Sequence, residues 1–241
     1  MVTIEIGPYN VFNDSLDNVL LNGDKKVINT INAHSYIVAK EDEEFREALI
    51  NSDILLPDGE GIVLMAKKLN GEKIKKIAGA DIHLKLLELA EKSELKCFYL
   101  GSSENTLGLI KEKLSKVYSH INFNFYSPPF KSSFSEQDNR EMIESVNNVN
   151  PDILFVGMTA PKQEKWVHQN KEFLNAKVIC SIGAVFDFIS ESKKRAPKWV
   201  INCRLEWLYR SFTAWRLTKR YMYSTPLFLF ELYKLKYLKK S

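Results

Sequence analysis

The stretch DILFVGMTAPKQEKW, residues 152–166, indicates the fold of this chain. It holds an apolar run that ends at Gly157, typical of a buried strand, and then a proline followed by polar residues, typical of the first turn of a helix. A glycine at the carboxyl end of a parallel strand lets the backbone turn tightly, and the next helix then points its free N–H groups outward. The stretch therefore predicts one strand, a tight turn and a helix.

The same pattern repeats along the chain. Apolar runs at 27–32, 53–57, 96–101, 121–126, 152–157 and 177–183 each predict a strand, and helical spacing lies between them, as at 79–92 and 103–118. This alternation predicts an α/β fold with a Rossmann-like, largely parallel sheet and flanking helices. Two further runs end in YLGS and SIGA, and open α/β sheets bind ligands at that edge. For any single glycine a turn role alone is the simpler explanation.

Length and composition limit the class of protein. A chain of 241 residues suits one large domain, or one domain with an appendage. Its three cysteines form no CxxC pair, which argues against a disulfide framework or a zinc site. The N-terminus lacks the basic start and apolar core of a signal peptide, and no run of about 18 apolar residues occurs. We therefore expect a cytoplasmic protein that does not span the membrane.

Charge is distributed unevenly along the chain. The net charge is +4, but residues 195–241 hold eleven Lys or Arg and two Glu, so this part carries +9 and the first 194 residues carry −5. The same part is rich in Trp, Tyr and Phe, its pattern is helical only, and Pro226 is predicted to divide it into two helices. We expect a catalytic domain at 1–194 and a helical, membrane-associating appendage at 195–241. A subunit interface is the alternative for the appendage.

Several polar residues follow the predicted strands. Asp58 stands between a proline and a glycine, where β-turn chemistry alone would explain it. Thr30 and Asn32 share one face of a strand and would grip a hydroxyl-rich ligand with Asp58, although either could simply cap the next helix. Gln163 suits a base edge or a ribose. The basic residues cluster at one end instead of lining a groove, so no nucleic acid partner is expected.

Taken in order, these motifs resemble the WecG/TagA/CpsF family of bacterial glycosyltransferases (glycosyltransferase family 26). The resemblance runs from about Asn29 to Tyr221 through TIN, LLPDGEG, IAGAD, FYLGS, GMTAPKQEKW, SIGAVFDFISESKKRAPKW and LEWLYR. It implies inverting transfer from a UDP-sugar to an undecaprenyl-diphosphate-linked sugar at the cytoplasmic face of the membrane. The best-known members transfer N-acetylmannosamine to lipid-linked N-acetylglucosamine. Pocket shape selects the donor, so N-acetylmannosaminuronic acid, glucose and galactose are alternatives, and a peripheral lipid-binding protein without catalysis is the rival outside enzymes.

The resemblance also implies roles for particular residues. Asp58 occupies the place of the proposed catalytic base, and Thr30 and Asn32 match the polar pair beside it. Lys76 stands where relatives usually carry arginine, and lysine cannot form a bidentate clamp on phosphate. There is no DxD motif, so neither a metal nor another cofactor is expected, and helix N-termini and cationic side chains are expected to stabilise the departing UDP. The expected substrate-binding residues are Lys76, Asp81, Gly101, Ser102, Gly157, Pro161, Gln163, Glu164, Gly183, Arg195 and Arg210.

Overall fold

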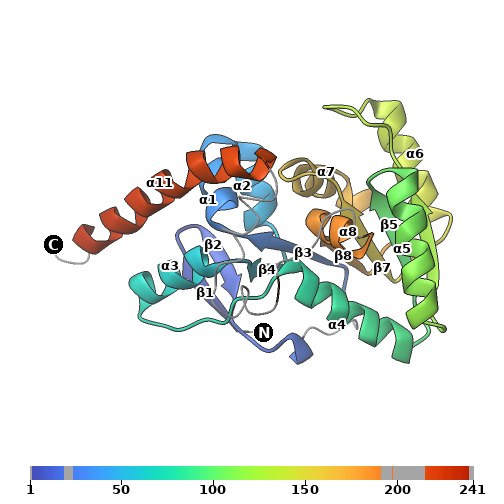
Figure 1. Cartoon of the computed structure of the whole chain (residues 1–241), viewed down its shortest axis with the longest axis horizontal. Coiled ribbons are helices and arrows are strands. Elements are labelled where there is room, and N and C mark those ends of the chain that lie inside the picture. The colour runs from blue at the N-terminus through green and yellow to red at the C-terminus, as the bar shows by residue number, and fades with distance from the viewer. Residues whose placement is uncertain (1, 19–23, 191–196, 198–214, 239–241) are drawn as a thin grey trace.

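The computed structural model describes residues 2–18, 24–190, 197 and 215–238, and it confirms the predicted α/β class (Figure 1). An eight-stranded sheet has the order β1-β2-β4-β3-β8-β7-β5-β6. Within the described residues, neighbouring strands pair in parallel except β1 and β2, which pair antiparallel. The strands are β1 (Thr3–Ile6), β2 (Tyr9–Phe12), β3 (Lys26–Ile31), β4 (Ile54–Pro57), β5 (Lys96–Gly101), β6 (Asn122–Tyr126), β7 (Ile153–Gly157) and β8 (Val178–Ser181).

All six strands predicted from apolar runs are present, whereas the hairpin of β1 and β2 was missed. Each of its strands has only four residues, and they meet at Gly7 and Pro8, where Gly7 has a φ of 60°. The pattern that could have revealed them is the alternation of Ile4 and Ile6 with polar residues before this glycine and proline. Their antiparallel pairing places β1 at the edge of the sheet.

Helices cover both faces of the sheet because side chains alternate along each strand. Ile28 belongs to one core cluster with α4, α5 and α8, whereas its neighbour Val27 belongs to another with α6 and α7. Ile31 belongs to a third cluster with α1, α2 and α3. The helices are α1 (Ala33–Glu41), α2 (Glu43–Ile50), α3 (Glu60–Asn70), α4 (Gly79–Lys92), α5 (Glu104–Val117), α6 (Glu136–Asn147), α7 (Lys162–Asn170) and α8 (Gly183–Ile189).

The described part of the C-terminal region is one helix, α11 (Trp215–Leu238), which lies against α1 and α3 (Figure 1). The prediction that Pro226 divides this region into two helices is therefore wrong within 215–238. Proline removes one helical hydrogen bond, but tertiary contacts hold the helix on both sides of it. Ser224 and Phe228 are buried, and the Phe228 ring packs edge-on against Tyr36 at a centroid distance of 5.8 Å.

Candidate active site at the carboxyl ends of the parallel strands

Asp58 lies directly beyond the carboxyl end of β4, beside the end of β3. Strands β3 and β4 run parallel with Ile31 opposite Pro57, and the backbone N–H of Asp58 donates to the Ile31 carbonyl at 2.8 Å. Asn32 and Asp58 are thus the next residues on two neighbouring strands. The chain turns after Asp58 through Gly59, whose φ of 120° is a conformation that side chains with a Cβ rarely adopt. Backbone geometry therefore fixes the position from which the half-buried Asp58 side chain extends.

Thr30 lies in β3, and Asn32 directly follows its last residue, Ile31. Thr30 is half-buried and lies opposite Leu56 in the strand register. The Asn32 side chain caps α1, because its Oδ1 accepts from the backbone N–H of Ser35 at 3.0 Å and from the Ser35 hydroxyl at 3.3 Å. The simpler explanation of Asn32 as a helix cap is confirmed. Its capping bond holds Asn32 beside the Asp58 turn.

The loop that contains Lys76 returns to the end of β4. The N–H of Ile77 donates to the Pro57 carbonyl at 2.9 Å. The backbone of Lys76, the residue before Ile77, therefore lies close to that of Asp58, the residue after Pro57. Asp81 lies in the first turn of α4, where its Oδ2 accepts from the Ala78 N–H at 2.8 Å. A carboxylate at this position satisfies a free N–H and interacts favourably with the helix dipole. Asp81 therefore stabilises the start of α4 beside the strand end.

The expected glycines allow the strand ends and α8 to pack closely. A Cβ on Gly101 would overlap the carbonyl of Gly157, and one on Gly157 would overlap the Phe186 ring. A Cβ on Gly183 would overlap the Met158 carbonyl. Packing alone thus explains these three glycines. Ser102 follows in a left-handed conformation with a φ of 59°, and its carbonyl accepts from Ser127 Oγ at 2.8 Å.

The GMTAPKQEKW segment places two buried polar side chains beneath this edge. Gln163 is 4% exposed and Glu164 is 2% exposed. Gln163 Oε1 accepts from the N–H groups of Met158 and Gly183, both at 3.1 Å, and its Nε2 donates to Glu164 Oε1 at 2.8 Å. Pro161 precedes α7 and follows a cis peptide bond. Gln163 thus joins the loop after β7 to the first residue of α8.

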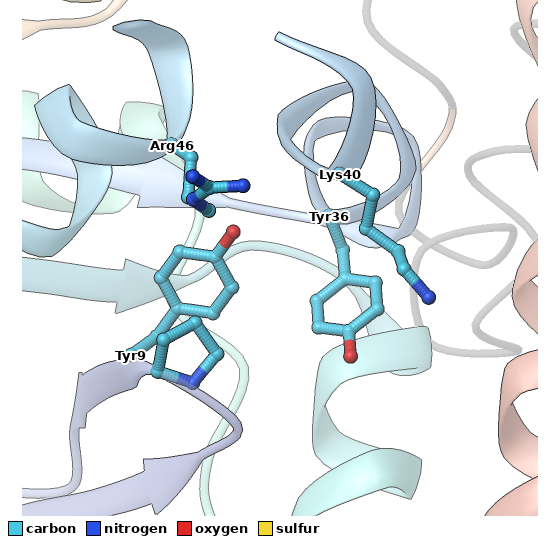
Figure 2. A pocket seen from close by; sticks show the side chains of 5 residues that line it. Tyr9, Tyr36, Lys40 and Arg46 are labelled. Carbon is cyan, nitrogen blue, oxygen red and sulfur yellow. The ribbon is translucent and has the colours of Figure 1, made fainter. Parts of the chain in front are cut away.

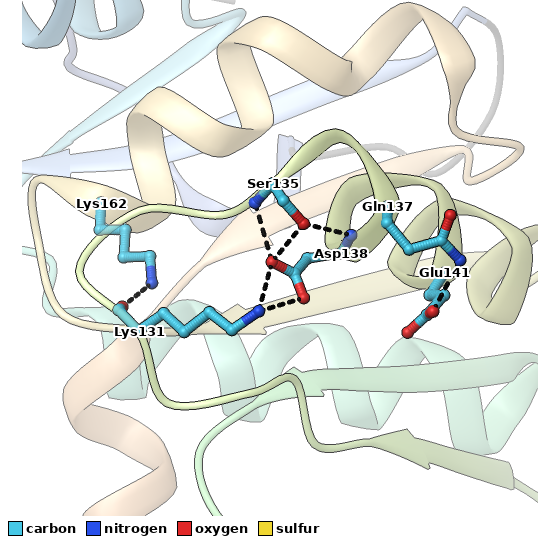
Figure 3. A network of polar contacts seen from close by, with 6 residues as sticks. All are labelled: Lys131, Ser135, Gln137, Asp138, Glu141 and Lys162. Atoms are coloured by element: carbon cyan, nitrogen blue, oxygen red, sulfur yellow. Dashed lines mark hydrogen bonds and ion pairs between the residues drawn. The ribbon is translucent and has the colours of Figure 1, made fainter.

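A loop that the sequence did not indicate lies next to α7 (Figure 3). Lys162 Nζ donates to the Lys131 carbonyl and lies 3.5 Å from the centroid of the Phe134 ring. Lys131 in turn bonds Asp138 at 2.8 Å, and Ser135 donates to the same carboxylate. Lys131 and Ser135 lower the pKa of Asp138 to about 2. The segment between β6 and α6 is thereby held against the start of α7.

A match to a family model covers residues 2–241 and describes the glycosyl transferase WecG/TagA/CpsF family. The chain belongs to this family. Its members in general transfer sugars, so the chain is a glycosyltransferase, and the family resemblance seen in the sequence is confirmed. Of the expected residues, Arg195 and Arg210 lie outside the residues that the structure describes.

Named relatives agree with this assignment. An N-acetylglucosaminyldiphosphoundecaprenol N-acetyl-beta-D-mannosaminyltransferase of Bacillus subtilis (strain 168) is 33% identical over 184 residues, which cover 76% of this chain and 70% of the relative. A protein of the same name from Bacillus spizizenii is 28% identical over the same shares. A third, from Staphylococcus aureus (strain MRSA252), is 24% identical over 93% of this chain and 83% of its own.

This WecG/TagA/CpsF-family chain has a cavity of about 230 Å³ between the β1–β2 turn and helices α1 and α2 (Figure 2). It is lined by Pro8, Tyr9, Tyr36, Lys40 and Arg46, none of which the sequence indicated. The Tyr9 hydroxyl points toward Arg46, and burial, together with the neighbouring Tyr36, raises the pKa of Tyr9 to about 12. Lys40 pairs with Glu231 of α11 at 2.7 Å. This cavity therefore lies beside the contact between α1 and α11.

Among the described residues of this family member, no helix combines the length and the apolar character that a membrane span requires. In the same residues, no group of three or more His, Cys, Asp or Glu is arranged to hold a metal ion.

Proposed function

We propose that this family member is an inverting glycosyltransferase that moves N-acetylmannosamine from a UDP-sugar to undecaprenyl-diphosphate-linked N-acetylglucosamine, in the synthesis of teichoic acid or another cell-surface polysaccharide. The names of its relatives support the acceptor and the sugar. The observation that supports the chemistry is the position of Asp58. Its backbone N–H bonds the Ile31 carbonyl, and the chain turns directly after it at Gly59. A positioned base within reach of the acceptor hydroxyl is what an inverting transfer needs.

In the proposed step the acceptor hydroxyl oxygen attacks the anomeric carbon of the donor sugar. The new C–O bond forms as the bond from that carbon to UDP breaks, and UDP leaves with the electron pair. Asp58 takes the proton of the attacking hydroxyl, and Thr30 and Asn32 orient the sugars beside it. Because the Asn32 Oδ1 already accepts two bonds from Ser35, its amide Nδ2 is the group for a sugar hydroxyl.

We place the UDP diphosphate at the same sheet edge. The N-terminal turns of α4 and α5 follow loops at this edge, and the positive end of a helix dipole favours an anion. Lys76 adds a cation near the end of β4, and Arg195 and Arg210 are proposed to reach the diphosphate from the C-terminal region. The backbone at Gly101, Ser102, Gly157, Pro161 and Gly183 forms the floor. We expect UDP to bind without added metal, so calorimetric titration should give the same affinity with and without EDTA.

For the membrane we propose that residues 195–241 act as an appendage that attaches to the anionic cytoplasmic leaflet. Phe228 and Leu232 face the domain, each 3% exposed. The opposite face of α11 presents apolar side chains at helical spacing, Met222, Leu229, Phe230 and Tyr233, all more than half exposed. An apolar stripe within a region of charge +9 suits an anionic lipid surface.

A panel of UDP-sugars tests the function. The protein is incubated with each donor and with a lipid-diphosphate-linked N-acetylglucosamine, and products are identified by mass spectrometry. We expect a product one N-acetylhexosamine heavier from UDP-N-acetylmannosamine. If a product forms only from UDP-N-acetylmannosaminuronic acid, UDP-glucose or UDP-galactose, that sugar nucleotide is the donor instead. If no donor of the panel gives a product, the proposed function is contradicted.

A further inference from the structure

Gln163 uses one oxygen atom to join two loops of the candidate site. Its Oε1 accepts from Met158, in the loop after β7, and from Gly183, the first residue of α8, at 3.1 Å each. An amide oxygen has two lone pairs, so both are occupied by the protein itself. The side chain is 4% exposed. Its oxygen therefore supports the site from behind and is not available to a ligand.

Glu164 fixes the orientation of that amide. The Nε2 of Gln163 donates to Glu164 Oε1 at 2.8 Å, and Glu164 is 2% exposed. The reversed amide would turn its NH2 group toward two N–H donors and its oxygen toward a carboxylate, which gives no hydrogen bond on either side. The carboxylate of Glu164 thus keeps the Gln163 oxygen pointed at the two loops.

Contiguous contacts lead from this pair to Asp58. Next to Gly183, Ile182 packs on the start of α4, where a Cβ on Gly79 would lie 3.3 Å from Ile182 Cγ2. The loop before α4 bonds β4 through the Ile77 N–H and the Pro57 carbonyl, at 2.9 Å. Asp58 follows Pro57 directly. A shift of α8 would therefore move the start of α4 and the strand end that carries the carboxylate.

We infer that Gln163 and Glu164 form a buried clamp, the Gln163–Glu164 clamp, that sets the spacing between the UDP-binding loops and Asp58. The two are positioning residues, and neither contacts the substrates. The inference rests on the proposed function for the identity of the ligand, UDP, and of the base, Asp58. It assigns the QE pair of GMTAPKQEKW to the wall of the site instead of to the nucleotide.

Exchange of the two side chains tests the clamp. In Gln163→Glu two carboxylates would face each other at the distance of the present hydrogen bond, and such a pair cannot stay fully ionised. We expect UDP affinity at pH 8 to fall by about tenfold or more and to recover toward pH 5.5, as the pair shares a proton. The double variant Gln163→Glu/Glu164→Gln restores these three hydrogen bonds, because the new glutamine donates to the new carboxylate, which still accepts from Met158 and Gly183. Its affinity should return to within a few-fold of wild type at both pH values.

The measurements are UDP titration by calorimetry, kcat and KM for the donor, and the amide proton resonances of Met158 and Gly183. A clamp predicts a raised donor KM in the single variant and amide resonances that titrate with the pair. The inference is overturned if the double variant binds UDP as weakly as the single one, the result expected of direct base contact by Gln163. It is also overturned if the single variant loses stability without any change in UDP affinity. A wild-type chain that binds no UDP would contradict the proposed function, and the two amide resonances would still decide the clamp.

Discussion

At the scale of single residues, backbone hydrogen bonds place the candidate base at the end of the sheet. The Asp58 N–H donates to the Ile31 carbonyl, Pro57 restricts the chain before it, and Gly59 adopts the positive φ that the turn after it requires. A carboxylate fixed in this way needs no reorganisation when the acceptor arrives. Substitution of the side chain alone should therefore separate chemistry from binding.

We predict that Asp58→Asn lowers kcat by roughly two to four powers of ten, the usual contribution of a general base. The amide has the same shape but cannot take the proton, so UDP affinity and the unfolding midpoint should stay close to wild type. Steady-state kinetics with the lipid acceptor and calorimetry with UDP measure both quantities. Asp24→Asn, at an exposed position, is the matched control and should have full activity. Full activity of Asp58→Asn would remove Asp58 from the mechanism.

At the scale of elements, α11 packs against α3, the helix that begins at Glu60, two residues after Asp58. A Cβ on Gly61, in the first turn of α3, would lie 3.0 Å from the Phe228 ring and 3.1 Å from Ala33. Phe228 can therefore lie this close only because residue 61 has no side chain. Three polar contacts hold α11 as well, from Lys40 to Glu231, from Tyr223 to Glu41 and from Lys68 to the Leu232 carbonyl.

Gly61→Ala and Gly108→Ala form a matched pair of helical substitutions. A Cβ on Gly108 in α5 would meet no atom within 4 Å, so Gly108→Ala should raise the free energy of unfolding by about 0.4–1 kcal/mol. Gly61→Ala overpacks the contact with Phe228 and should lower it by about 1–3 kcal/mol. Urea unfolding of the three proteins measures the difference. Equal stabilisation by both substitutions would mean that α11 does not pack on α3 in solution.

At the scale of the whole molecule, the largest core cluster contains a titratable group that must stay neutral. His83 is buried among aromatic rings, its Nε2 lies 2.7 Å from the Tyr99 hydroxyl, and burial lowers its pKa to about 3. The unfolded chain binds this proton near pH 6.5 and the folded chain does not, so stability from this group is present above pH 6.5 and is lost as the pH falls toward 3. Asp138, with a pKa of about 2, would lose its contribution only below about pH 4.

We therefore predict that the free energy of unfolding falls by about 1.4 kcal/mol per pH unit from His83 alone between pH 6 and pH 4.5. His83→Gln keeps a partner for the Tyr99 hydroxyl but does not titrate. This variant should have lower stability at pH 7 and a correspondingly flatter pH dependence. Urea unfolding at intervals of half a pH unit gives both slopes. Identical slopes for the variant and the wild type would show that His83 does not carry the effect.

The outer face of α11 leads to a prediction about attachment to membranes. Leu229→Gln/Phe230→Gln removes two exposed apolar side chains and no charge, and each would contribute about 1–3 kcal/mol if it inserted. Binding to liposomes rich in phosphatidylglycerol should fall by tenfold or more in co-sedimentation. Val117→Gln, at an exposed position in α5, is the control and should bind normally. If α11 is instead a subunit interface, the double variant will differ from the wild type in its mass in solution, and the wild type will not bind the liposomes.

Local patterns were sufficient for the class of fold and for most of the strands. Six apolar runs, three of them ended by glycine, predicted β3 to β8, because both a buried strand and a tight turn depend on a few consecutive residues. The apolar run at 53–57 also predicted that Asp58 directly follows a strand, which the end of β4 at Pro57 confirms. The strands of the short hairpin of β1 and β2 had too few consecutive residues for the same inference. Pro226 indicated a break because the hydrogen bond that proline removes is local, whereas the contact of Phe228 with Tyr36, which stabilises the helix, joins residues far apart in the chain.

The neighbours of each site residue depend on the order of the strands. Strand β3 lies between β4 and β8 although about 150 residues separate it from β8 in the chain, and its parallel pairing with β4 places Asn32 beside Asp58. The same holds for Gln163, which looks like a nucleotide ligand in the sequence but has both lone pairs of its oxygen occupied by Met158 and Gly183 in the fold. The type of a side chain limits which hydrogen bonds it can form. Its actual partners are set only by the fold, because a hydrogen bond acts over about 3 Å and the fold must first bring distant segments that close together.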